Sequence, residues 1–103
     1  MAPVAFAPVD DGVAAIRSIL PDAHITSGYR SPDNPLSRAN PNSWHTKSHA
    51  AVDIAPMNGL DFAGAVQRIR QAGYGLIESR DEQAHPLPWT TGPNWHFVLG
   101  KGR

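Results

Sequence analysis

Ten prolines and nine glycines divide this 103-residue chain into short segments. Both residue types break helices and strands, so their frequency favours a small fold that is rich in loops. The apolar fraction of 41% is ordinary for a globular protein, and the length suits one domain with one modest core. We therefore expect a single domain over residues 1–103, in which residues 1–9 form an extended lead-in.

Two amphipathic segments predict helices. Asp10 or Asp11 can cap the first helix, which runs to about Leu20. Leu60 or Asp61 starts the second helix. Its apolar stripe consists of Phe62, Ala65, Val66, Ile69 and Ala72.

Four short apolar segments predict strands, at residues 23–27, 50–55, 74–78 and 94–100. Two polar stretches, 28–48 and 79–93, predict long loops between them. The order helix, strand, strand, helix, strand, strand predicts an α+β fold, in which a small, mainly antiparallel sheet carries helices on one face.

The stretch "SWHTKSHAAVDIAP", residues 43–56, suggests a metal site, because His45, His49 and Asp53 follow one another at intervals of four. In a helix all three side chains would share one face. In a loop followed by a strand, only the residues aimed at the same side of the sheet would bind. The β-branched Val52 and Ile54 favour the strand. The spacing alone does not choose between the two histidines.

Alternation along the strands places Asp53 and His96 together. In residues 94–100 the large apolar side chains alternate with His96, and in residues 50–55 Val52 and Ile54 flank Asp53. If the apolar faces meet the helices, Asp53 and His96 point to the opposite side of the sheet. A carboxylate inside an apolar strand is costly unless it is compensated.

The types of residue present indicate which metal these side chains would bind. The chain has no cysteine, so a transition metal would be held by histidine and carboxylate. Two histidines and a carboxylate with one open position are typical of catalytic zinc sites, where the metal activates water and polarises a carbonyl. Taken singly, each of these residues is more typical of an exposed loop histidine, a histidine at a sheet edge, or a turn or capping aspartate than of a metal ligand.

Several loop residues suit hydrolytic chemistry. Arg30 follows the first predicted strand and is a candidate to pair with a substrate carboxylate, or with Asp33. Glu78 ends the third strand, and Glu82 and His85 follow it. Each of these three is a candidate general base.

Charge and hydropathy limit the partners. The formal net charge is zero and no basic block occurs, which argues against nucleic acid as a partner. No apolar stretch approaches transmembrane length, so we expect no membrane insertion. The N-terminal residues lack the positive and apolar regions of a signal peptide.

Three blocks of the chain resemble a known family. "ITSGYRSPDN", "NSWHTKSHAAVDIAP" and "GPNWHFVLG" occur in this order between about Ile25 and Gly100. They resemble the zinc D-Ala-D-Ala peptidases, a family that includes bacterial DD-carboxypeptidases, vancomycin-resistance dipeptidases and phage endolysins. The form of the second block is most similar to the branch found in phage virion and lysis proteins. The resemblance implies the compact α+β fold that this family shares with the hedgehog signalling domain.

The resemblance also implies a set of site residues. Residues His45, Asp53 and His96 match the ligands of Zn²⁺, and Arg30 matches the arginine that holds a carboxylate or carbonyl oxygen of the substrate. Ser43 would contact the ligand residues without binding the metal itself.

The chain departs from the family pattern at two places. The separation of His45 and Asp53 is eight residues instead of seven, which keeps His49 as an alternative ligand. Pro93 stands where many relatives carry a catalytic glutamate. The base would then come from Glu78, Glu82 or His85, in that order of preference.

The resemblance therefore predicts a zinc-dependent peptidase that hydrolyses stem or cross-link peptides of peptidoglycan, as a carboxypeptidase or an endopeptidase. A phage-encoded enzyme of this kind would reside in the virion, or in the host cytoplasm before release, and act on the cell wall. Other domains or virion proteins would be its further partners. The alternative is a non-catalytic module of the same fold that binds peptidoglycan or serves as a structural part of a virion.

Overall fold

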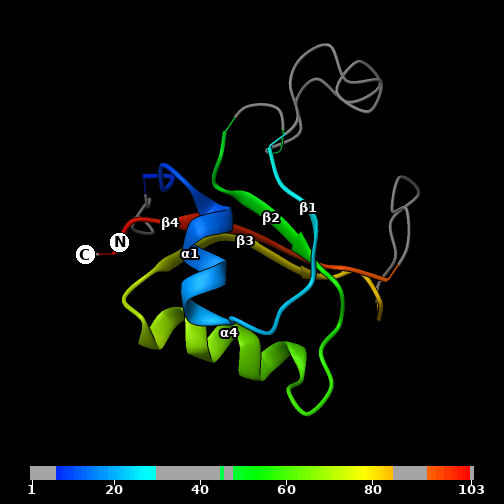
Figure 1. Cartoon of the computed structure of the whole chain (residues 1–103). Helices are drawn as coiled ribbons and strands as arrows, with labels where there is room; N and C mark the ends of the chain where they lie inside the picture. Colours follow the sequence, from blue (N-terminus) through cyan, green and yellow to red (C-terminus); the bar gives the residue numbers. More distant parts are fainter. Residues whose placement is uncertain (1–6, 30–44, 46–47, 85–92, 103) are drawn as a thin grey trace.

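The computed structural model describes residues 7–29, 45, 48–84 and 93–102. Within these ranges the chain forms two helices and four strands (Figure 1). The elements, in chain order, are α1 (Gly12–Ile19), β1 (Ile25–Ser27), β2 (Ala51–Ile54), α4 (Phe62–Gln71), β3 (Gly75–Asp81) and β4 (Trp95–Gly100). The strands form one antiparallel sheet in the order β1-β2-β4-β3. The predicted α+β class is confirmed.

Both helices begin at an aspartate, as the sequence predicts. The side chain of Asp11 accepts a hydrogen bond from Ala14 N at 3.0 Å. Asp61 does the same for Gly64 N at 2.8 Å. Each bond satisfies one of the amide groups left without a partner at a helix N-terminus.

The core lies between the two helices and one face of the sheet. Buried apolar side chains from α1, α4, β2 and β4 form a single cluster that consists of Ala15, Ile16, Leu20, Val52, Ile54, Ala65, Ile69, Trp95, Phe97 and Leu99. The large side chains of β4 therefore all point toward the helices, as their alternation predicts. The other face of β4 presents His96 and Val98.

Strand β3 differs from the prediction in its length. The sequence predicts a strand at 74–78 followed by a loop, but β3 continues to Asp81 because Ser79, Arg80 and Asp81 still pair with β4. The assignment of residues 79–81 to a loop was wrong. The cross-strand partners of these polar residues stabilise a strand that their own β-propensity does not indicate.

A register shift in β3 decides which of its side chains face the helices. Leu76 pairs with Leu99, and Glu78 pairs with the next residue back along β4, Val98, so one extra residue of β3 is accommodated between them, as in a β-bulge. Without this shift Glu78 would alternate onto the helix side with Leu76. The bulge instead places Glu78 on the side of Val98 and His96, away from the core.

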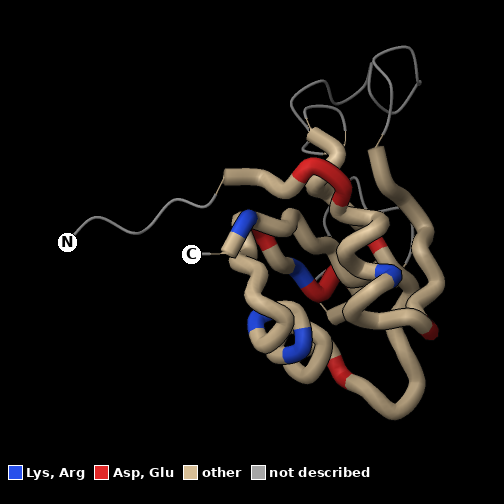
Figure 2. The backbone as a smooth tube through the Cα atoms, turned by 60° about the vertical axis from the view of Figure 1, so that its left-hand side comes forward, with Lys and Arg blue, Asp and Glu red and all other residues tan. Residues whose placement is uncertain are grey.

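Lys, Arg, Asp and Glu are spread over several segments of the described backbone (Figure 2). Neither described helix reaches the length and apolarity that crossing a bilayer requires. The second helix is also amphipathic, with only Ala65 and Ile69 fully buried.

Gly12 provides a test of how α1 is seated against the start of β2. A Cβ atom at this position would lie 2.6 Å from Ala50 O and 2.9 Å from Val52 Cγ2. In an open helix Gly→Ala is favourable by about 1 kcal/mol. Here we expect Gly12→Ala to lower the free energy of unfolding by about 1–3 kcal/mol, because α1 must move off the strand.

Urea denaturation followed by circular dichroism measures this effect. Ser18→Ala, on the exposed side of the same helix, is the matched control and should change the stability by less than about 0.5 kcal/mol. A Gly12→Ala protein as stable as the wild type would contradict the close approach of α1 to β2.

Candidate metal centre

Three buried side chains converge on the face of the sheet away from the helices. Asp53 lies in the middle of β2 and His96 near the start of β4, and the two are direct cross-strand partners. His45 joins them from the segment before β2. Their exposed fractions are 3% for His45, 8% for Asp53 and 4% for His96, so all three are withdrawn from solvent.

The potential donor atoms of these residues lie close together. Nδ1 of His96 is 2.7 Å from Oδ1 of Asp53, and Nε2 of His45 is 3.2 Å from the same oxygen. The two nitrogens are 3.3 Å apart. The three residues thus offer two imidazole nitrogens and one carboxylate oxygen within 4.8 Å of one another.

In each histidine, the ring nitrogen that points away from Asp53, called here the far nitrogen, lies next to a hydrogen-bond acceptor. Nδ1 of His45 is 2.8 Å from the carbonyl oxygen of Gly28, and Nε2 of His96 is 3.1 Å from Oε1 of Glu78. Carbonyl and carboxylate oxygens only accept, so these two nitrogens carry the protons. The two nitrogens that face Asp53 donate to its carboxylate in the absence of a metal, and in neutral rings they would instead present lone pairs to a metal bound between the rings and Asp53. Metal-binding histidines show the same arrangement.

These distances can be compared with those of a tetrahedral zinc site. Ligand bonds of about 2.0 Å place the ligand atoms about 3.3 Å apart. Two of the three separations at His45, Asp53 and His96 agree with this value. The third, at 2.7 Å, is a hydrogen bond that a metal would replace. Without a metal, both rings need a second proton to bond Asp53, whereas a cation satisfies all three lone pairs at once.

The electrostatics of Asp53 favour its charged form. Burial raises the pKa of the Asp53 carboxyl, but hydrogen bonds from His45 and His96, together with their charges, outweigh burial and hold that pKa well below its usual range. Asp53 is therefore an anion at every physiological pH. A buried carboxylate in this state requires a positive partner.

Two further carboxylates border the three residues from β3 and its end. Glu78 and Glu82 flank Arg80, whose Nη2 is 3.5 Å from Oε1 of Glu78 and whose Nε is 3.8 Å from Oε2 of Glu82. Glu82 is 6% exposed. Burial raises the pKa of the Glu82 carboxyl, and the negative charge of Asp53 raises it further.

The structure separates the two histidines that the spacing left equivalent. His45 joins Asp53 and His96, whereas His49 is exposed and stacks on the ring of Tyr29 with centroids 4.0 Å apart. His49 belongs to no group of potential metal ligands among the described residues. Asp53 lies in strand β2, Ala51–Ile54, which confirms the strand that the sequence favours here, and the alternative of one helix over residues 45–53 is excluded.

The remaining predicted site residues have different positions. Glu78 contacts the far side of His96, and Glu82 contacts Arg80, the cross-strand partner of His96. Arg30, Ser43 and His85 lie outside the described residues.

Sequence reasoning missed Arg80. Glu78, Arg80 and Glu82 follow one another at intervals of two, along β3 and just past its end, so all three share a face, and the letters "ESRDE" contain this pattern. The prediction of a loop at 79–93 concealed it, because side chains alternate between two faces only in a strand.

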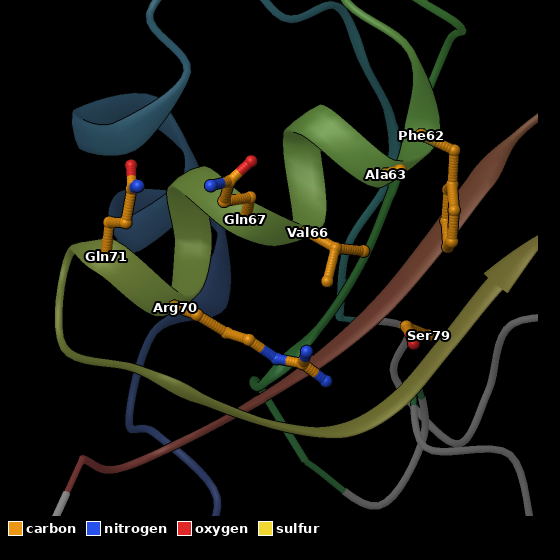
Figure 3. A pocket seen from close by; sticks show the side chains of 7 residues that line it. All are labelled: Phe62, Ala63, Val66, Gln67, Arg70, Gln71 and Ser79. Atoms are coloured by element: carbon orange, nitrogen blue, oxygen red, sulfur yellow. The ribbon is translucent and has the colours of Figure 1, made fainter.

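A separate groove lies on the helix side of the sheet, between α4 and β3 (Figure 3). The side chains of Val66 and Arg70 extend from α4 toward β3, where Ser79 lies. None of the groove residues belongs to the cluster around Asp53. The groove is thus distinct from the candidate metal centre.

Comparisons of the chain with protein-family models, with curated proteins and with solved structures found no match.

The ligand set can be tested by removing its members singly. We expect His45→Ala and Asp53→Ala to weaken Zn²⁺ binding by more than the roughly 10–100-fold that loss of an outer hydrogen bond causes. His49→Ala should bind Zn²⁺ like the wild type, because its ring lies against Tyr29. Competition with a chromophoric chelator measures the affinities. Stoichiometric, tight zinc in the His45→Ala protein would contradict the assignment.

The environment of Glu82 predicts a pH dependence of stability in the metal-free protein. Because its pKa is raised on folding, the folded state holds this proton more tightly than the unfolded chain. The contribution of Glu82 to the free energy of unfolding therefore falls as the pH rises above the ordinary value of 4.5.

The free energy of unfolding of Glu82→Gln minus that of the wild type should increase from about pH 4 to about pH 7, because glutamine has no proton to lose. Urea denaturation in the presence of a chelator at several pH values measures the difference between the two proteins. A difference that stays constant over this range would contradict the burial of an ionisable Glu82.

Proposed function

We propose that this chain is a zinc-dependent peptidase that hydrolyses stem or cross-link peptides of bacterial peptidoglycan. The observation that carries the proposal is the convergence of His45, Asp53 and His96, with each histidine anchored through its far nitrogen. Two imidazoles and one carboxylate leave a fourth position open, which is typical of catalytic zinc sites.

The charge around these residues also favours a divalent cation. Asp53, Glu78 and Glu82 are three carboxylates on one side of the sheet, and Arg80 is the only guanidinium that the described residues place among them. With neutral histidines this leaves about two negative charges, which a divalent cation balances. When bound there, zinc would polarise an amide carbonyl and lower the pKa of a nearby water.

The protein's own residues would handle the proton. Hydrolysis adds the oxygen of water to the carbonyl carbon and breaks the C–N bond, so one proton must pass from the water to the leaving amine. Glu78, which contacts His96, and Glu82, which contacts the cross-strand partner of His96, Arg80, are described carboxylates that could accept and return it. Arg30, by its place in the first motif, would hold a carboxylate or carbonyl oxygen of the substrate.

The substrate class rests on the sequence. The blocks around Arg30, His45 and His96 resemble the zinc D-Ala-D-Ala peptidases, whose substrates are peptidoglycan peptides. The hedgehog-like form of the α+β fold, a phage origin and a role at the cell wall belong to the same proposal. The observed order of helices and strands is compatible with it.

A second candidate is a non-catalytic module that binds peptidoglycan or builds a virion. Pro93 favours it, because a proline replaces the glutamate that many members of the resembled family use as a base. This module could keep the three ligands and still bind zinc.

Digestion of purified peptidoglycan distinguishes the two candidates. We expect the wild-type protein to release new amino or carboxyl termini, detectable by mass spectrometry, and to stop doing so in the presence of a chelator. Restoring zinc should restore cleavage, whereas Asp53→Ala should stay inactive. Binding to peptidoglycan without new termini, at full zinc occupancy, would contradict the peptidase and support the module.

A further inference from the structure

We infer that Glu78 is a positioning residue that holds the imidazole of His96, and that, among the carboxylates of the described residues, Glu82 is the one that accepts the proton. The part that concerns Glu82 rests on the proposed peptidase, whereas the part that concerns Glu78 requires only metal binding. Sequence reasoning placed Glu78 first among the candidate bases, and the contacts of its carboxylate point to a different role.

The contact of Glu78 lies on the wrong side of the ring for a base. Oε1 of Glu78 is 3.1 Å from Nε2 of His96, while Nδ1 of the same ring faces Asp53 at 2.7 Å. The imidazole therefore stands between the Glu78 carboxylate and the point where the three donor atoms converge. A carboxylate that accepts the Nε2 proton leaves Nδ1 as the free lone pair, and this selects the tautomer that can bind a metal.

His45 has an equivalent anchor of a different kind. Its Nδ1 is 2.8 Å from the carbonyl oxygen of Gly28, so the backbone fixes that ring. The ring of His96 depends on a side chain, since the acceptor that the structure gives its Nε2 is Glu78. Substitution can remove this acceptor without altering the backbone, which makes the role of Glu78 testable.

Arg80 ties the two glutamates together. It lies 3.5 Å from Glu78 and 3.8 Å from Glu82, and its backbone pairs with His96. Glu78 is therefore held by two partners, His96 and Arg80, whereas among the described residues the carboxylate of Glu82 forms an ion pair with Arg80 alone. The backbone of Glu82 pairs with that of Asn94, two residues before His96, and Glu82 follows Arg80 by two residues, so its side chain falls on the same face of the sheet as His96.

Glu78→Ala and Glu78→Gln separate positioning from base catalysis. The amide oxygen of glutamine can still accept the Nε2 proton, but glutamine cannot take up a proton from water. We expect Glu78→Ala to weaken Zn²⁺ binding by about 10–100-fold, and Glu78→Gln to recover most of this loss. With saturating zinc, Glu78→Gln should also retain most of the cleavage activity.

Glu82→Gln should behave in the opposite way. We expect its Zn²⁺ affinity to stay within a few-fold of wild type and its cleavage rate to fall by about 10²–10⁴-fold. Ser79→Ala is the matched control for β3, because this exposed side chain lies on the helix side and touches none of the ligands. It should leave both measurements unchanged.

Chelator competition measures zinc affinity, and ¹⁵N-resolved NMR of the imidazoles reports which nitrogen of His96 is protonated in the zinc-loaded protein. Protonated Nε2 in wild type and in Glu78→Gln, together with weakened zinc binding in Glu78→Ala, is the expected result. Unchanged zinc affinity in Glu78→Ala, or loss of cleavage in Glu78→Gln with zinc binding intact, would overturn the inference. If the wild type binds zinc but cleaves nothing, the peptidase proposal fails while the affinity measurements still decide the role of Glu78.

Discussion

The antiparallel pairing of Asp53 with His96 is the contact on which the rest of the candidate site depends. Directly paired residues of neighbouring strands point to the same side of the sheet, so the register of β2 and β4 brings a carboxylate and an imidazole within 2.7 Å. The same register turns the large apolar side chains of both strands toward the helices. Core and site are thus two results of one pairing, and neither can shift without the other.

This arrangement makes the buried polar groups compatible with a small core. Asp53 is an anion surrounded by apolar strand residues, which would be unfavourable by itself. Two histidines compensate it, and each histidine is held in turn by an acceptor outside the cluster. Groups connected in this way lose little by burial, and they gain a fixed geometry that a mobile surface cluster lacks.

Parts of the fold and site that follow from alternation could be predicted from the sequence. The face shared by Asp53 and His96 follows from the side-chain period of two, and the helix starts follow from aspartates before apolar stripes. The choice of His45 over His49 could not be made this way, because it depends on the contacts of His45 with Gly28 and of His49 with Tyr29, residues distant in the chain. The contact of Glu78 with His96 was equally hidden, since it requires the irregular pairing of β3.

That irregular pairing has a consequence for how the site can change in evolution. The one extra residue between Leu76 and Glu78 sets the phase of every side chain that follows in β3. Deletion of a single codon there would rotate Glu78, Arg80 and Glu82 toward the hydrophobic core and turn Ser79 and Asp81 to the opposite face. A point substitution in β3 changes one side chain of the site, whereas a change of one residue in the length of β3 would exchange the two faces of the strand. Chains of this kind should therefore tolerate variation in the identity of these residues more readily than variation in their number.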